Sequence, residues 1–378
     1  MKGRQNYVCR RRFADASAQR ELFDDDTEIF DKIREWVDST VTGSRSDLSF
    51  VPPEGMWSRI NSESDACMGM RCPYHSECFV MKMRKEAAGA NILVVNHHLL
   101  FADIESRIHG VSYEDTAVLP PYRRIIFDEA HGIESAATSF FSESFSRFKI
   151  TKQLNQLYRR RKNSESGHLC TLAVLSSAEE NVAEAYELVN RIKTDITNLE
   201  TAALDLLQKD FNLRLFAGTA REFGPVLTLC NTLASDLGKF TGLCRLIMEG
   251  VAEDDRTVPA FYETKILVRR LEDFSVVLRD FCEWEEKSDR VFWICRKMLP
   301  KDMVKDGGES VYVVFTETVV VIGALTAISA IVAPVVDHVV DQTDRTFQIR
   351  QVVVVKPGVT AVVVGKEIVV VGGVLAAP

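Results

Sequence analysis

Residues 124–131 read Arg-Ile-Ile-Phe-Asp-Glu-Ala-His, an apolar run that ends in two adjacent carboxylates. Short apolar runs bounded by polar residues are typical of buried strands in parallel sheets. Residues 92–95, Ile-Leu-Val-Val, form a second run of this kind. Two such strands close together in the chain indicate an α/β fold. Asp128 and Glu129 are then expected at the carboxyl end of a strand, in the crevice where α/β sheets bind ligands.

Two carboxylates at such a strand end suit the metal-assisted hydrolysis of a nucleotide. The first, Asp128, would hold Mg²⁺ directly or through water, and Glu129 would polarise the attacking water. His131 follows two residues later and would relay the state of the nucleotide to other parts of the site, or else serve as a capping or core histidine. Asp-Glu pairs are also common on surface turns. The functional interpretation of this pair therefore depends on the apolar strand that precedes it.

The spacing of the cysteines is compatible with a metal centre. The chain has nine of them, and no apolar signal segment follows Met1, which indicates a reducing compartment, the cytoplasm. Cys67, Cys72 and Cys78 are separated by four and five residues, with Cys9 far upstream. Structural zinc sites typically use pairs two residues apart, whereas loose, unequal spacing suits an iron–sulfur cluster. Spacing alone leaves a cluster, a zinc ion and plain structural cysteines open.

The charge pattern favours local rather than general contact with nucleic acid. The formal net charge is −8, which excludes a uniformly basic DNA-binding domain. Basic patches occur at residues 10–12, 82–85 and 158–162. Each patch also fits a solvated helix face. The candidate phosphate contacts are Arg10, Arg11, Arg12, Lys82 and Arg84.

Residues 149–290 are expected to be helical. Apolar residues recur at alternating steps of three and four from Val182 to Leu206, from Val226 to Ile247 and from Leu267 to Phe281. This spacing places one apolar stripe on each helix and predicts a bundle of antiparallel helices. Proline often occupies the first position of a helix, so Pro225 and Pro259 mark expected helix starts. Cys230 and Cys244 fall on a stripe and are interpreted as core residues.

The composition changes from about residue 301. Of the 68 residues from 311 to 378, 23 are valine, and residues 318–336 carry no charge. That uncharged run is long enough to span a membrane. However, it contains Gly323 and Pro334 and lacks flanking Lys or Arg, so no membrane is favoured. Runs of β-branched residues favour strands or aggregation, and a shifted reading frame explains this tail equally well.

Taken together, four segments resemble the DinG and XPD family of iron–sulfur DNA helicases, the DinG branch in particular. Residues 2–9, Lys-Gly-Arg-Gln-Asn-Tyr-Val-Cys, resemble the segment with the first cluster ligand, and residues 67–79 the segment with the other three. Residues 90–100 resemble the strand and turn that re-enter the motor lobe, and residues 128–131 match the DEAH box. The resemblance is close over residues 1–148 and looser to about residue 300.

The resemblance implies a partial RecA-like P-loop NTPase motor lobe with an iron–sulfur cluster insertion and an α-helical arch insertion. The expected domains are a cluster domain, a part of motor lobe 1 with the DEAH box, the arch, a strand returning to the motor lobe through Phe292-Trp293-Ile294, and a valine-rich tail. Their boundaries are residues 1–90, 91–148, 149–290, 291–300 and 301–378, respectively.

By the same resemblance the protein would be a monomer that couples ATP hydrolysis, with Mg²⁺, to 5′-to-3′ movement along single-stranded DNA, and would unwind forked duplex DNA. Cys9, Cys67, Cys72 and Cys78 would hold a 4Fe-4S cluster that keeps a wedge rigid. The basic residues near the cluster would meet phosphates. Tyr74 and Phe79 would stack on bases or pack around the cluster.

The chain also departs from the family. The phosphate-loop pattern Gly-x-x-x-x-Gly-Lys-Ser/Thr does not occur in residues 1–378, and neither do the motifs of the second motor lobe. In the family the loop precedes the segment that matches residue 1, so Met1 is expected to be an internal start. We therefore expect no sustained ATPase or helicase activity from this chain alone. The alternatives are a non-catalytic module that binds a cluster and single-stranded DNA, and a structural zinc protein held at a membrane by its tail.

Overall fold

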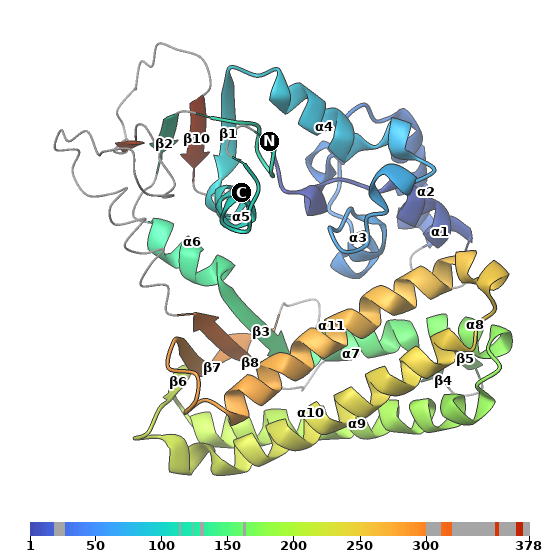
Figure 1. Ribbon diagram of the computed structural model, residues 1–378, viewed down its shortest axis with the longest axis vertical. Coiled ribbons are helices and arrows are strands. Elements are labelled where there is room, and N and C mark those ends of the chain that lie inside the picture. Colours follow the sequence, from blue (N-terminus) through green and yellow to red (C-terminus); the bar gives the residue numbers. More distant parts are fainter. Residues whose placement is uncertain are drawn as a thin grey trace. The chain divides into compact units, whose positions relative to one another are not determined.

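The computed structural model describes residues 1–18, 27–112, 115–122, 124–128, 132–161, 164–299, 311–319, 352–354 and 368–372 (Figure 1). It divides the chain into two compact units. The first comprises residues 1–140 and 322–378, and the second comprises residues 141–321. The described part therefore mixes helices and strands, as the α/β prediction requires.

The first unit begins with a small helical region. Its helices are α1 (Arg10–Ala18), α2 (Thr27–Ser39), α3 (Glu54–Ile60) and α4 (Phe79–Ala88), with single 3-10 turns η1 (Arg4–Asn6), η3 (Arg45–Asp47), η4 (Gly69–Arg71) and η5 (His75–Glu77). Their core includes Trp57, Ile33 and Phe79. Gly43 has φ +64° and lies against the Phe79 ring so closely that a Cβ there would overlap it. Glycine is thus required at this crossing.

A parallel sheet follows in the same unit. Its order is β1 (Ile92–Asn96), β10 (Ile368–Gly372), β2 (Arg124–Phe127) and β9 (Val352–Val354), and the helices α5 (His97–Ile108) and α6 (Ile133–Phe140) follow β1 and β2. The two strands expected from the sequence are therefore present. β1 differs from the expectation of full burial, because the side chains of Ile92 and Val94 remain 54% and 60% exposed.

The second unit is built around long helices that share one core (Figure 1). They are α7 (Arg147–Leu157), α8 (His168–Leu175), α9 (Glu179–Leu207), α10 (Ala220–Glu249) and α11 (Pro259–Cys282), with η7 (Glu253–Thr257) and the small hairpin β4 (Arg159–Arg161) and β5 (Ser164–Ser166). The three predicted stripes lie on α9, α10 and α11, and Cys230 and Cys244 are buried, as expected. Burial raises the pKa of both thiols.

The two prolines behave differently. Pro259 opens α11, as predicted. Pro225 lies inside α10, which begins at Ala220. The turn before Pro225 carries Phe223, which is fully buried in the core of the unit. Packing of the Phe223 side chain explains why α10 begins before Pro225. The proline lacks a backbone N–H, so the helix loses one hydrogen bond at that position.

The second unit also contains an antiparallel sheet of order β3 (Ser142–Ser146), β8 (Val311–Val319), β7 (Arg290–Met298) and β6 (Asn212–Leu215). Residues 291–300, expected to return to the motor lobe, hold most of β7, whose described partners are β6 and β8 of this unit. The rings of Phe145 on β3 and Phe315 on β8 stack with centroids 4.6 Å apart. β3, the first strand of the second unit, therefore pairs with β8, its last described strand.

A group of charged side chains lies between α11 and this sheet. The Arg290 Nη1 donates to Asp280 Oδ2 at 2.7 Å and to Glu317 Oε1 at 2.5 Å, and Lys287 pairs with Asp280 at 3.0 Å. Glu143 on β3 stands opposite Glu317 on β8 in the register. Burial raises the pKa of Glu317 to about 7, Asp280 and Glu143 act in the same direction, and Arg290 opposes them.

The valine-rich tail contributes β8, β9 and β10, in line with its strand-forming composition. Most of the uncharged run, residues 320–336, lies outside the described residues. Among the helices that the structure describes, none has the length and apolar character needed to cross a membrane.

Candidate functional site

The two predicted strand ends lie on the same edge of the parallel sheet. Val95 of β1 and Phe127 of β2 both pair with Val371 of β10, so they stand in one row across the sheet. Asn96 directly follows Val95, and Asp128 directly follows Phe127. Asp128 therefore takes the place predicted for it, at the carboxyl end of a parallel strand. Glu129 and His131 lie outside the described residues.

His97 is a neighbour of Asp128 that sequence inspection did not single out. Its buried ring stacks on Phe127 with centroids 6.2 Å apart, and its Nε2 has no hydrogen-bond partner among the described residues. Burial lowers the pKa of His97, the charge of His98 lowers it further, and the charge of Asp128 opposes both. His97 also opens α5, where Asn96 caps the helix by accepting from the Leu99 amide at 2.9 Å. Burial thus favours the neutral form of the His97 imidazole, which stacks on the residue before the candidate metal-binding carboxylate.

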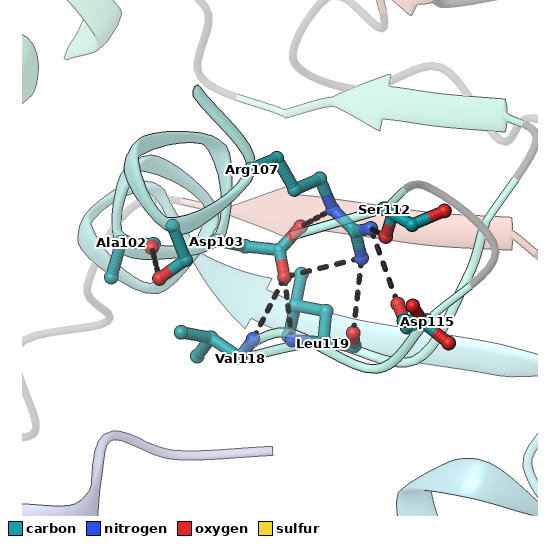
Figure 2. Close-up of polar contacts among 8 residues, drawn as sticks. Ala102, Asp103, Arg107, Ser112, Asp115, Val118 and Leu119 are labelled. Atoms are coloured by element: carbon teal, nitrogen blue, oxygen red, sulfur yellow. Dashed lines mark hydrogen bonds and ion pairs between the residues drawn. The ribbon is translucent and has the colours of Figure 1, made fainter. Parts of the chain in front are cut away.

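A buried ion pair on α5 fixes the segment that leads into β2 (Figure 2). The Nε of Arg107 donates to Asp103 Oδ2 at 2.8 Å, and both side chains are buried. Asp103 Oδ1 accepts from the amides of Val118 and Leu119 at 3.0 and 2.7 Å. The guanidinium of Arg107 also donates to three carbonyls, those of Ser112, Asp115 and Leu119.

This clamp, the pair Asp103 and Arg107 with its backbone partners, ties Ser112, Asp115, Val118 and Leu119 to α5. Every polar atom that the pair brings into the interior thereby gains a partner, which is the condition for burying charge. Sequence inspection missed it. The available signal was an acid and an arginine four residues apart on a helix that is otherwise largely apolar.

The cysteine-bearing segments meet in the first unit. Arg10, which follows Cys9, pairs through Nε with Glu77 at 3.4 Å, next to Cys78. Arg11 donates to the carbonyl of Ala66 at 3.1 Å, next to Cys67. The chain thus brings the distant Cys9 to the segments that carry Cys67 and Cys78, as a shared centre requires.

The local settings of the four cysteines differ. Cys9 immediately precedes α1; burial raises the pKa of its thiol, whereas the Arg12 amide and the charges of Arg11 and Arg12 lower it. The Sγ of Cys67 accepts from the Gly69 amide at 3.4 Å. Cys72 and Cys78 each end a single 3-10 turn, and Cys78 also caps α4.

The four thiols are free, and their chemistry fits either a cluster or a zinc ion. Across the described ranges, however, no group of three or more His, Cys, Asp or Glu side chains is arranged to hold a metal ion. The structure therefore brings the segments together without showing a metal site.

The predicted phosphate contacts divide into two kinds. Arg11 and Arg12 are buried, and Arg12 donates to the carbonyls of Asn61 and Ser58 and pairs with Glu63. For either side chain to reach a phosphate, it would have to leave partners inside the protein. Lys82 is exposed on α4 and available to solvent.

Arg10 and Lys82 both lie over the ring of Phe79, at 5.0 and 5.5 Å from its centroid. Phe79 itself is fully buried, so it packs in the core of the cysteine region and does not present a face to a base. Tyr74, the other aromatic residue considered for stacking, is half-buried.

Comparison with known proteins gives a family relationship over part of the chain. No protein-family model matches it. It is 35% identical over 164 residues to the ATP-dependent DNA helicase YoaA of Haemophilus influenzae, covering 42% of this chain and 25% of that protein. The YoaA of Escherichia coli is 32% identical over 190 residues, 48% of this chain and 29% of the relative.

The ATP-dependent helicase DinG of Mycobacterium tuberculosis is 32% identical over 154 residues, 37% of this chain and 22% of the relative. The chain therefore spans about a quarter of the length of the curated relatives that it matches. Over less than half of its own length, it is homologous to the YoaA and DinG helicases.

Proposed function

We propose that this chain is a section of an ATP-dependent 5′-to-3′ DNA helicase, namely part of its first motor lobe with an iron–sulfur domain and a helical arch. The observation that carries this proposal is the position of Asp128 at the carboxyl end of a parallel strand, in a chain homologous to ATP-dependent DNA helicases. Asp128 would hold the Mg²⁺ of the bound nucleotide, and Glu129 would polarise the attacking water. Burial favours the neutral form of His97, which would leave the negative charge of Asp128 to the metal ion.

We expect no sustained ATP hydrolysis from this chain by itself, because its 378 residues contain no phosphate-loop pattern to cradle the phosphates. The measurement is steady-state phosphate release by the purified chain, with and without single-stranded DNA. The matched control is Asp128→Asn. DNA-stimulated release that Asp128→Asn abolishes would show that the chain is competent and would contradict the expectation.

We further propose that Cys9, Cys67, Cys72 and Cys78 hold a 4Fe-4S cluster. The support is the meeting of their segments through Arg10 with Glu77 and Arg11 with Ala66. The cluster, when bound, would cross-link the start of α1 to the segment between Cys67 and the start of α4. The exposed Lys82 on α4 would meet the phosphates of single-stranded DNA.

The cofactor proposal predicts iron and acid-labile sulfide in matching amounts in protein purified without oxygen. Cys72→Ser should lose both, since it removes one ligand of the four. Cys295→Ser, on β7 in the second unit, is the matched control and should retain both. Stoichiometric zinc without sulfide would instead favour a structural zinc protein.

A second candidate is a non-catalytic module that binds a cluster and single-stranded DNA, favoured by the lack of a phosphate-loop pattern in the chain. Sequencing the coding DNA on both sides separates the two. A phosphate-loop motif in frame upstream, with second-lobe motifs after residue 300 in any frame, supports a section of a helicase. Finding neither motif supports the module.

A further inference from the structure

The antiparallel sheet of the second unit has two unlike faces. Phe145, Phe315 and Ile294 stand in one row across β3, β8 and β7, and they lie in the core that the sheet shares with the helices. Successive side chains of a strand point to opposite faces, so the neighbouring rows belong to the other face. One row of this outer face reads, from β3 to β6, Ser144, Thr316, Trp293 and Arg214.

Charge is divided unequally between the two faces. The carboxylates of the four strands in their described ranges, Glu143 and Glu317, stand opposite each other in the register on the face toward the helices. The outer face carries Arg214 on β6 and Lys297 on β7, both exposed, and none of its described strand residues is acidic. The formal net charge of the chain is −8, so this face is a local positive surface on an acidic protein.

Each aromatic side chain of the outer face stands next to a cation. Trp293 on β7 is opposite Arg214 on β6, and Tyr312 on β8 is opposite Lys297 on β7. Opposite residues of an antiparallel pair have Cβ atoms about 5 Å apart. Trp293 and Lys297, four residues apart on the same strand, are separated by about 13 Å. Aromatic planes beside cations are the combination that proteins use to bind the bases and phosphates of a single strand.

The start of α7 borders the outer face on the side of β3. The Phe148 ring meets the Tyr312 ring edge-on with centroids 5.2 Å apart, and Lys149 Nζ donates to the Oγ and the carbonyl of Ser144, both at 2.8 Å. The middle of β8 is buried. The accessible part of the face is therefore the half formed by β6 and β7, where Trp293 is half-buried between exposed cations.

We propose that the half of the outer face formed by β6 and β7 binds single-stranded DNA, with a base stacked on Trp293 and phosphates at Arg214 and Lys297. Stacking on an indole tolerates any base, because every base has a π-face, and the neighbouring cations neutralise the backbone. The choice of DNA rests on the proposed function, whereas the binding face rests on the strand register. The site lies in the second unit, while Lys82, the phosphate contact proposed above, lies in the first.

The test is the binding of a fluorescein-labelled oligo(dT) of about 16 nucleotides to the full chain, followed by fluorescence anisotropy over a range of salt concentrations. Trp293→Ala should weaken binding about tenfold, because a stacking partner is lost. Trp293→Phe keeps an aromatic face and should retain most of the affinity. Arg214→Ala and Lys297→Ala should each reduce the slope of log affinity against log salt by about 0.7. Arg269→Ala, exposed on α11, is the matched control and should change neither quantity.

Three results would overturn the proposal. The first is an unchanged affinity in Trp293→Ala, and the second is equal binding of oligo(dT) and of duplex DNA, whose paired bases cannot stack on the indole. The third is tighter binding of oligo(U), which would assign the face to RNA, or equal competition by poly-glutamate, which would assign it to an acidic peptide. Absence of iron and sulfide from the chain would contradict the cofactor proposal and leave these binding expectations unchanged.

A Trp293→Ala variant that fails to fold is covered by a second measurement. The wild-type chain is photocross-linked to oligo(dT) in which 5-iodouracil replaces single thymines, and the modified peptides are sequenced. The iodinated base attaches to an aromatic side chain on which it stacks. Attachment at Trp293 supports the proposal, whereas attachment that spares β6, β7 and β8 overturns it.

Discussion

Replacing Asp103 with alanine is expected to lower the free energy of unfolding of the first unit by about 3–5 kcal/mol. The change leaves the buried guanidinium of Arg107 without its carboxylate and leaves the amides of Val118 and Leu119 without an acceptor. Val118 and Leu119 would then detach from α5, and the entry to β2 would loosen with them. Hydrogen exchange across residues 97–127 and chemical denaturation of the full chain measure the two effects.

The chain offers a matched control for this substitution. Glu28 and Lys32 on α2 form an ion pair with the same spacing and the same order, at 2.7 Å, but their side chains are 84% and 56% exposed. Glu28→Ala should leave the unfolding free energy unchanged within error, because exposed pairs contribute little. Equal effects of Glu28→Ala and Asp103→Ala would show that burial of the clamp has no energetic consequence.

The second unit is expected to gain stability as the pH falls from 8 to 5. The pKa of Glu317 is raised to about 7 in the folded protein, from a usual value of 4.5. The folded state therefore binds a proton that the unfolded state lacks in this interval. Ionisation of Glu317 is unfavourable in the folded state, so the penalty is complete above pH 7 and absent below about pH 4.5. This group alone should add about 2–3 kcal/mol to the unfolding free energy between pH 8 and pH 5.

Several charged groups act on Glu317, so a variant must isolate its share. Glu143 on β3 and Asp280 on α11 supply negative charge, and Arg290 on β7 supplies positive charge. Asp273 acts on Glu143, and Lys287 pairs with Asp280. Glu317→Gln cannot ionise and should lose this part of the pH dependence, whereas Glu222→Gln, exposed on α10, should keep it. Hydrogen exchange of the amides of α11 and β7, measured across denaturant, follows the second unit. Identical pH profiles for wild type and Glu317→Gln would contradict the prediction.

Periodicity and strand-end motifs predicted much of the architecture. The apolar runs at residues 92–95 and 124–127 became strands, and the three stripes became α9, α10 and α11, because burial of an apolar face depends mainly on local spacing. The position of Pro225 was not predicted, because the burial of Phe223 outweighs the cost of the proline in α10. β7 also pairs with β6, which precedes it in the chain by the whole of α10 and α11, and no local pattern reveals that pairing.

The candidate site shows the same division. Asp128 lies at the carboxyl end of β2, as predicted, because the end of a strand can be located from the local sequence. Arg11 and Arg12 looked like surface cations in the sequence but are internal, because their partners Ala66 and Asn61 lie about fifty residues away. The clamp of Asp103 and Arg107 could have been suspected from its spacing, although its backbone partners in residues 112–119 could not.

The pairing of β3 with β8 has a consequence for synthesis on the ribosome. β8 is an inner strand of its sheet, yet it is the last part of the second unit to be made, following α7 through α11 and β7. The helices can collapse early, because their contacts are mostly between neighbours in the chain. The sheet must wait until residue 319 has left the exit tunnel, and until then β3 and β7 have unpaired edges. Protection from other nascent chains during that delay should therefore decide how much of this unit reaches its native state.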